Sequence, residues 1–131
     1  MKIKKDVISK IIAHAKRGVP LEVCGYLAGQ NGVINKHYEL TNLDQSEVHF
    51  SFDPKEQFAV VKDARAKGYD IGAVYHSHPA SPARPSQEDI RLAYDPHISY
   101  VIVSLADGKA DIKSFKIREK QVIPEAIDIV D

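Results

Sequence analysis

The sequence predicts an α/β protein with a single mixed β-sheet flanked by helices. Two observations predict this fold class. Segments with apolar residues at helical spacing alternate with short apolar or alternating runs, and no repeat, linker or low-complexity segment interrupts them. The chain has 131 residues, of which 44% are hydrophobic and 27% charged. A chain of this size and composition is expected to form a single domain, residues 1–131, with one hydrophobic core.

The first helix is predicted over residues 4–17. Gly18 and Pro20 end its pattern, since neither residue continues a helix well. Lysines fill the gaps between apolar residues that recur at helical spacing: Ile3, Val7, Ile8, Ile11, Ile12 and Ala15.

Three strands are expected next. Cys24–Gly29 and Val33–Leu40 are separated by Gln30-Asn31-Gly32, and Asn-Gly is a strong signal for a tight hairpin turn. Val48–Phe52 has the composition of a third strand.

The second helix has a clear start signal at residues 53–56. Asp53 can cap the helix, Pro54 suits its first turn, and Glu56 can reach back to the cap amide. Gly68 ends the pattern. The C-terminal half adds a strand at Ile71–His76, a short helix at Ser86–Tyr94, a nearly all-apolar central strand at Ile98–Leu105, and an alternating strand at Ala110–Ile117. Residues 121–130 give no definite pattern.

Charge and cysteine content narrow the function classes. Lysine plus arginine equals aspartate plus glutamate at 18 each, so no global basic field points to nucleic acid or an anionic membrane. No apolar stretch approaches the length of a membrane span, and no signal peptide is recognisable. The single cysteine, Cys24, excludes a four-cysteine zinc site and fits a reducing compartment. We expect a cytoplasmic protein in which Cys24 is a small buried strand residue.

His76-Ser77-His78 is the first candidate for chemistry. Side chains two apart on a strand share a face, so both imidazoles can bind one metal ion while Ser77 faces away. The pair lies at the carboxyl end of its strand, where sites in open α/β sheets are found. On its own, a His-x-His pair is more often a surface feature than a metal site.

The stretch Ser86-Gln87-Glu88-Asp89 admits two interpretations. Ser-x-x-Asp is a capping-box pattern for a helix start, and this interpretation alone would suffice. If the loop after Pro79 returns to the histidines, however, Asp89 becomes a third metal ligand. Three nitrogen and oxygen ligands suit a catalytic zinc ion with water in the fourth position, although manganese, iron and cobalt stay open.

The spacing His76-x-His78, seven residues, Ser86, two residues, Asp89 resembles the JAMM motif of MPN-domain metalloproteases. Glu22, in Pro20-Leu21-Glu22-Val23-Cys24, occupies the position of the family's upstream glutamate. The resemblance extends from the first helix to about Ile117, and all five motif positions match. It implies an MPN (JAMM) domain with layering similar to that of cytidine deaminases.

The resemblance also implies roles for these residues. His76, His78 and Asp89 would bind one Zn²⁺ per chain, with water as fourth ligand. Glu22 would move the proton of the attacking water, and Ser86 would donate a hydrogen bond to the oxyanion. Without the resemblance, Glu22 would be interpreted as a solvated loop residue. The implied reaction is hydrolysis of the amide bond after the C-terminal Gly-Gly tail of a ubiquitin-like or sulfur-carrier protein.

Several alternatives remain open. The leaving amine is either cysteine or a lysine side chain, and the Glu-x-Cys-Gly context favours the sulfur-carrier substrate slightly. A non-catalytic MPN scaffold that binds a partner protein is the second hypothesis. A deaminase would need a Pro-Cys-x-x-Cys pattern, which a chain with one cysteine lacks. The family also allows a homodimer.

Overall fold

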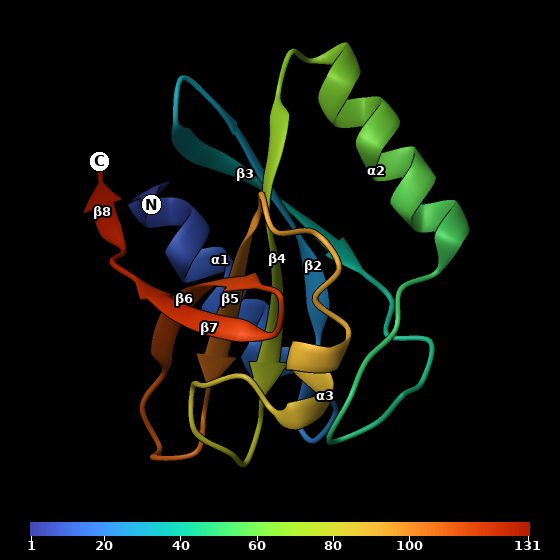
Figure 1. The fold of residues 1–131 in the computed structure, drawn as a ribbon, viewed down its shortest axis with the longest axis vertical. Coiled ribbons are helices and arrows are strands. Elements are labelled where there is room, and N and C mark those ends of the chain that lie inside the picture. Colours follow the sequence, from blue (N-terminus) through green and yellow to red (C-terminus); the bar gives the residue numbers. More distant parts are fainter.

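Eight strands form one mixed sheet in the order β7-β6-β5-β4-β2-β3-β1-β8, in a computed structural model that describes residues 1–131 (Figure 1). This confirms the predicted single mixed sheet flanked by helices. The helices are α1 (Lys5–Gly18), α2 (Pro54–Ala66) and α3 (Gln87–Arg91). The strands are β1 (Lys2–Lys4), β2 (Cys24–Gln30), β3 (Val33–Leu40), β4 (Asp70–His78), β5 (Ser99–Ser104), β6 (Asp111–Arg118), β7 (Gln121–Glu125) and β8 (Asp128–Val130).

The β2–β3 hairpin turns at Asn31-Gly32, as predicted. Both residues have positive φ, 55° and 77°, which is the backbone that an Asn-Gly turn supplies without strain. The antiparallel register pairs Gln30 with Val33 and Cys24 with Leu40. The register shifts once between these pairs, at Ala28 and Gly29, so the turn and this irregularity together set which β2 residues lie opposite which β3 residues.

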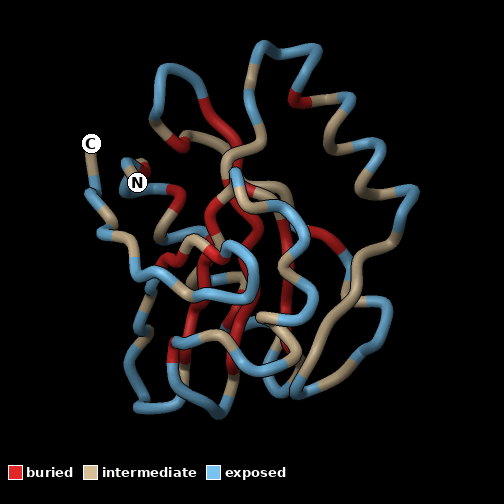
Figure 2. Tube along the Cα trace, in the orientation of Figure 1, coloured by how far each residue is buried: buried red, intermediate tan, exposed pale blue.

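β4 and β5 are parallel neighbours at the centre of the sheet, and both are covered on their two faces. Val101 and Val103 of β5 belong to one apolar cluster, and Ile102 belongs to a second cluster on the opposite face. The buried segments in Figure 2 follow these central strands. The predicted central strand at Ile98–Leu105 is thus confirmed.

The helices are divided between the two faces of the sheet. α1 packs Val7, Ile11 and Ala15 into the first cluster. α2 and α3 contact the other face, through the hydrogen bond from Gln57 to the Tyr26 hydroxyl and through Ile90 against the second cluster. No helix in the structure is long and apolar enough to cross a bilayer.

The predicted strand at Val48–Phe52 is wrong. Within this segment, only an isolated antiparallel bridge joins Phe52 to Asn42. Two backbone groups of the segment bond to the Asn42 side chain and not to a strand, since the His49 carbonyl accepts from Asn42 Nδ2 and the Ser51 amide donates to Asn42 Oδ1. Residues 41–53 form an irregular connection instead.

α2 begins as predicted in one respect and differs in another. The Asp53 carboxylate accepts from the Lys55 amide, and Pro54 occupies the first turn. Glu56 does not reach back to the cap. Its two carboxylate oxygens accept from the Thr41 amide (2.7 Å) and the Thr41 hydroxyl (2.8 Å), which clamps both ends of the 41–53 segment together.

The C-terminal region contains more strand and less helix than predicted. α3 is shorter than the predicted 86–94, because Ser86 caps it and Leu92 ends it. Residues 121–130 form β7 and β8, which lie at opposite edges of the sheet although only Ala126 and Ile127 separate them. The sheet is therefore strongly curled, and β8 pairs with the unpredicted β1.

Candidate metal centre

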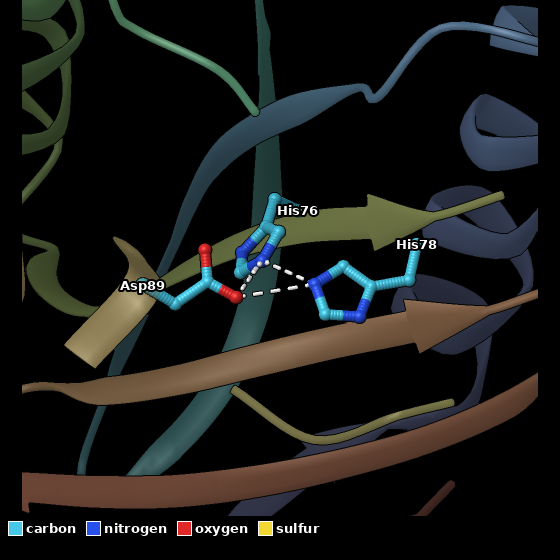
Figure 3. A group of neighbouring side chains, drawn as sticks. All are labelled: His76, His78 and Asp89. Atoms are coloured by element: carbon cyan, nitrogen blue, oxygen red, sulfur yellow. Dashed lines mark hydrogen bonds and ion pairs between the residues drawn. The ribbon is translucent and has the colours of Figure 1, made fainter. Parts of the chain in front are cut away.

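The two histidines at the end of β4 point toward a carboxylate from α3 (Figure 3). His76 Nε2 and His78 Nε2 are 3.1 Å apart, and each lies 3.1 Å from Asp89 Oδ2. The side chains of both histidines are 4% exposed and that of Asp89 is 13% exposed. Residues 13 positions apart in the sequence thus form one compact, largely buried group.

Strand alternation places the two imidazoles together, as predicted. Ser77 points to the opposite face and is fully buried. Its hydroxyl oxygen accepts from the Val23 amide (2.8 Å), and its own amide donates to the Val23 carbonyl (3.0 Å). Ser77 therefore ties the end of β4 to the residue that follows Glu22.

The capping interpretation of Ser-x-x-Asp is confirmed, and the position of Asp89 is compatible with the metal-ligand interpretation. The Asp89 amide donates to Ser86 Oγ (3.0 Å), and the Ser86 amide donates to Asp89 Oδ2 (2.9 Å), which is a complete capping box. The same Oδ2 atom faces the two histidines. Because Ser86 Oγ accepts from the Asp89 amide, its own hydrogen is left to donate elsewhere. The cap thus holds the Asp89 carboxylate in the orientation that faces His76 and His78.

The tautomer of His78 is fixed by its loop. Nδ1 lies 2.8 Å from the Pro82 carbonyl oxygen, which can only accept, so Nδ1–H donates to Pro82. In a neutral imidazole, Nε2 then carries a lone pair. This is the arrangement that metal-binding histidines adopt, with the outer nitrogen held by a carbonyl.

The three donor atoms fit a zinc ion. Bonds of about 2.0–2.2 Å in a tetrahedral site place ligand atoms about 3.3–3.6 Å apart. The observed separations of 3.1 Å therefore need to widen by only a few tenths of an ångström. Two imidazole nitrogens and one carboxylate oxygen are a donor set found in catalytic zinc sites and also in non-haem iron sites. Three lone-pair atoms that converge in a buried place require a shared proton or a cation among them.

The contacts within the group shift the pKa values of Asp89 and His78 in opposite directions. Burial alone would raise the pKa of Asp89, but the close contacts of its carboxylate with the His76 and His78 imidazoles outweigh burial and hold that pKa far below its usual range. Burial likewise lowers the pKa of His78, whereas hydrogen bonds to Asp89 and Pro82 raise it, and the net direction is upward. Asp89 is therefore an ionised carboxylate in this site.

Glu22 precedes β2 and lies at the level of the histidines. The antiparallel register pairs Cys24 with His76, so Glu22 falls opposite His78. Glu22 is 4% exposed, and its Oε1 is a buried oxygen without a hydrogen-bond partner. Burial raises the pKa of Glu22 to about 8. The solvated loop glutamate that its position alone would suggest is thus a buried carboxyl with an open acceptor.

Some residues that support the candidate metal centre were not predicted from the sequence. The Phe50 ring stacks on the His76 ring, with centroids 4.7 Å apart. The Pro82 carbonyl and the Asn42 side chain also support the site. The prolines of the 79–85 loop are a sequence signal for a rigid turn. Phe50 and Asn42 carry no local signal, because they contact His76 and Glu22, which are far from them in the sequence.

The other histidines and the cysteine lie outside the group. Cys24 is fully buried, as predicted, with Sγ 3.8 Å from the Leu40 carbonyl, and burial raises the pKa of its thiol to about 12. The remaining imidazoles contact other partners: His14 with Tyr75, His37 with Glu39, His49 with Asp44 and His97 with Asp95.

A hollow of about 340 Å³ adjoins the group on the same face of the sheet. His76 and Asp89 form part of its wall, and most of the remaining lining is apolar, with Tyr26, Phe52 and Tyr100 among its aromatic residues. Gln57 of α2 and Glu88 of α3 line it from the two helices.

The chain is similar in sequence to several known proteins. Residues 4–118 match the family described as prokaryotic homologs of the JAB domain. The chain is 33% identical to the CysO-cysteine peptidase of Mycobacterium tuberculosis over 98% of this chain and 90% of that protein. It is 31% identical to the desampylase of Haloferax volcanii over 83% of each chain.

Solved structures of other proteins are similar to this chain in fold. A protein from Desulfitobacterium hafniense is 45% identical, with a TM-score of 0.90 over 99% of this chain and 92% of that one. A JAB1/MPN domain protein from Archaeoglobus fulgidus has a TM-score of 0.70 over the full length of both chains, at 23% identity. The latter likeness concerns the fold, which is the MPN fold that the motif implied.

Proposed function

Because the chain belongs to the family of prokaryotic homologs of the JAB domain, we propose that it is a zinc-dependent peptidase acting on the C-terminal tail of a ubiquitin-like or sulfur-carrier protein. The bond hydrolysed is the amide that follows the terminal Gly-Gly. Relatives named CysO-cysteine peptidase and desampylase support this substrate class. The observation that carries the proposal is the group of His76, His78 and Asp89, with mutual distances of 3.1 Å beside the buried Glu22.

Each residue has a distinct task in this proposal. His76, His78 and Asp89 hold the ion. Zinc bound there supplies Lewis-acid chemistry, since it lowers the pKa of water to about 7 and polarises a carbonyl. The Glu22 carboxylate takes the proton of the attacking water as the C–O bond forms, and it passes that proton to the leaving amine when the C–N bond then breaks. The Ser86 hydroxyl donates to the developing oxyanion.

The tail is proposed to lie along the apolar hollow. Glycine has no side chain, so a Gly-Gly end can reach donor atoms on side chains that are only 4% (His76) and 13% (Asp89) exposed. The leaving amine is proposed to be cysteine first and a lysine side chain second, because the match to the CysO-cysteine peptidase covers more of the chain than the match to the desampylase.

The test uses protein purified without a metal-binding tag. We expect about one zinc per chain by elemental analysis, and cleavage of a carrier whose tail ends in Gly-Gly-Cys or is linked to lysine, followed by mass spectrometry. Glu22→Gln is expected to keep zinc and to lose at least ~10²-fold in rate, because removing a general base typically costs ~10²–10⁴-fold. His76→Ala/His78→Ala is expected to lose zinc and activity together.

His97→Ala serves as the matched control, because the His97 side chain is 89% exposed and outside the group. It should retain wild-type zinc content and rate. A zinc-loaded wild type that cleaves neither conjugate would favour the non-catalytic scaffold. Equal rates in wild type and Glu22→Gln would remove Glu22 as the base.

A further inference from the structure

The 41–53 segment between β3 and α2 is organised around the side chain of Asn42. Its Nδ2 donates to the carbonyls of Glu22 and His49, both at 3.0 Å. Its Oδ1 accepts from the amides of Asp44 (3.0 Å) and Ser51 (3.3 Å). A primary amide has two donors and two acceptor lone pairs, so these four bonds use its full capacity. The side chain is thus held in one orientation.

One of these bonds reaches the backbone of Glu22. β2 begins only at Cys24 and Ser77 bonds Val23 to β4, but none of these bonds reaches the main-chain amide or carbonyl of Glu22 itself. Its main chain is held from the 41–53 segment instead, because its amide donates to the Ser46 carbonyl (2.8 Å) and its carbonyl accepts from Asn42. The placement of the Glu22 carboxyl therefore depends on the conformation of that segment.

The same segment also touches one of the three candidate metal ligands His76, His78 and Asp89, which together are called the metal group. Phe50 lies one residue after His49, whose carbonyl accepts from Asn42, and its ring stacks on His76 at an interplanar angle of 30°. Ser51 and Asp44 hold the backbone on either side of this contact. Asn42 thus joins the main chain of Glu22 to the segment that packs on His76.

We propose that Asn42 is a positioning residue that holds the Glu22 carboxyl in register with the metal group. This inference rests on the proposed function for the catalytic task of Glu22. Asn42 touches neither the donor atoms nor the reacting bond. Its effect is geometric, and a displacement of about 1 Å at a catalytic group can cost ~10²-fold in rate.

The experiment compares two substitutions in the same segment, each made in the full chain. Asn42→Ala removes all four bonds, including the one to Glu22. Asp44→Ala is the matched control, since it removes the contacts of the Asp44 carboxylate with His49 Nδ1 (2.9 Å) and Ser51 Oγ (2.9 Å) but leaves the Asn42 bonds in place. Asn42→Asp keeps the two acceptor bonds and loses both donor bonds, to the carbonyls of Glu22 and His49, which guards against a poorly folded alanine variant.

Three readouts are expected to separate the variants. In Asn42→Ala and Asn42→Asp, kcat falls ~10–100-fold with KM within ~3-fold, and zinc per chain stays at the wild-type value. Hydrogen exchange of the Glu22 amide speeds up at least ~10-fold, while the Leu27 amide inside β2 exchanges at the wild-type rate. In Asp44→Ala, kcat and the exchange of the Glu22 amide stay within ~3-fold of wild type.

Three outcomes would overturn the inference. The first is wild-type kcat together with wild-type Glu22 exchange in both Asn42 variants. The second is an equal loss of kcat in Asp44→Ala, which would reflect general loosening of the segment. The third is loss of zinc in the Asn42 variants. If the wild type cleaves no conjugate, the proposed function fails by itself, and faster Glu22 exchange in the Asn42 variants alone still supports the placement of Glu22.

Discussion

At the scale of single residues, Gly25 shows how closely the strand behind the metal group is packed. Gly25 lies on β2 and pairs with Tyr75 of β4. A Cβ at this position would collide with the Tyr38 carbonyl oxygen and with the Tyr75 ring. Tyr75 is fully buried, and its hydroxyl is 2.7 Å from His14 Nδ1, so the ring has no room to move away. The absence of a side chain is therefore a packing requirement.

Gly25→Ala is expected to destabilise the protein by about 1–3 kcal/mol, because overpacking of a dense core costs that much. Thermal unfolding in the wild type and the variant measures the effect. Gly72→Ala on β4 is the matched control, because a Cβ there would meet only the flexible end of Ile34 at 2.8 Å. An equal melting temperature for wild type and Gly25→Ala would show that the Tyr75 ring can shift.

At the scale of elements, α3 combines a capping box with the chemical roles proposed for Ser86 and Asp89. It is a helix of five residues, held at its start by the reciprocal bonds between Ser86 and Asp89. So short a helix depends on its cap and on packing rather than on propensity. The cap fixes the carboxylate that faces His76 and His78. A rigid helix start thus presents the third donor atom to the two that β4 supplies.

Substitutions at Ser86 can separate these tasks. Ser86→Thr keeps a hydroxyl and a cap, and we expect activity within ~10-fold of wild type. Ser86→Asp keeps a good capping side chain but lacks the neutral hydroxyl donor, so it should retain zinc while kcat falls ~10²–10³-fold. Elemental analysis and conjugate cleavage measure both. Unchanged kcat in Ser86→Asp would restrict Ser86 to its capping role.

At the scale of the whole molecule, the curl of the sheet is held by Glu125 at the end of β7. Its Oε1 accepts from the hydroxyls of Ser99 on β5 (2.6 Å) and Ser114 on β6 (2.7 Å). From there the chain crosses to β8, which pairs with β1 at the other edge. The Met1 amino group donates to the Ala126 carbonyl (2.8 Å), which ties the N-terminus to this crossing. The assignment of residues 1–131 to one domain stays a prediction.

The stabilising effect of Glu125 is expected to depend on pH. Burial raises the pKa of this carboxyl, but the hydrogen bonds from Ser99 and Ser114 lower it further, so the net direction is downward. A folded-state pKa below the unfolded value of about 4.3 contributes stability above that pH. The contribution is lost as the pH falls through the folded-state pKa.

Glu125→Gln should therefore unfold at a lower temperature than wild type at pH 7, and the difference should shrink below about pH 4. Thermal unfolding from pH 7 to pH 3 tests this. Glu47→Gln, at an exposed position, is the control and should follow the wild-type curve. A difference that persists unchanged at pH 3 would mean that the ionised carboxylate is not what stabilises the curl.

The sequence by itself determined the local features of this protein. Caps, turn residues and hydrophobic periodicity depend on neighbours in the chain, so α1, the β2–β3 hairpin, the α2 start and the shared face of His76 and His78 were predictable. So was the motif, because its spacing is a property of one short stretch plus Glu22. The irregular structure of Val48–Phe52 and the identity of the edge strands were not predictable from the sequence. Strand pairing depends on which other segments folding brings alongside.

Only the tertiary structure decided how the site is held. The burial of Glu22, the stacking of Phe50 on His76 and the four bonds of Asn42 join segments that are far apart in sequence. No local pattern records such contacts, because each side chain gains its role from the partner that folding brings to it. The position of Asp89 beside the two histidines was decided in the same way, once the 79–85 loop returned α3 to the end of β4.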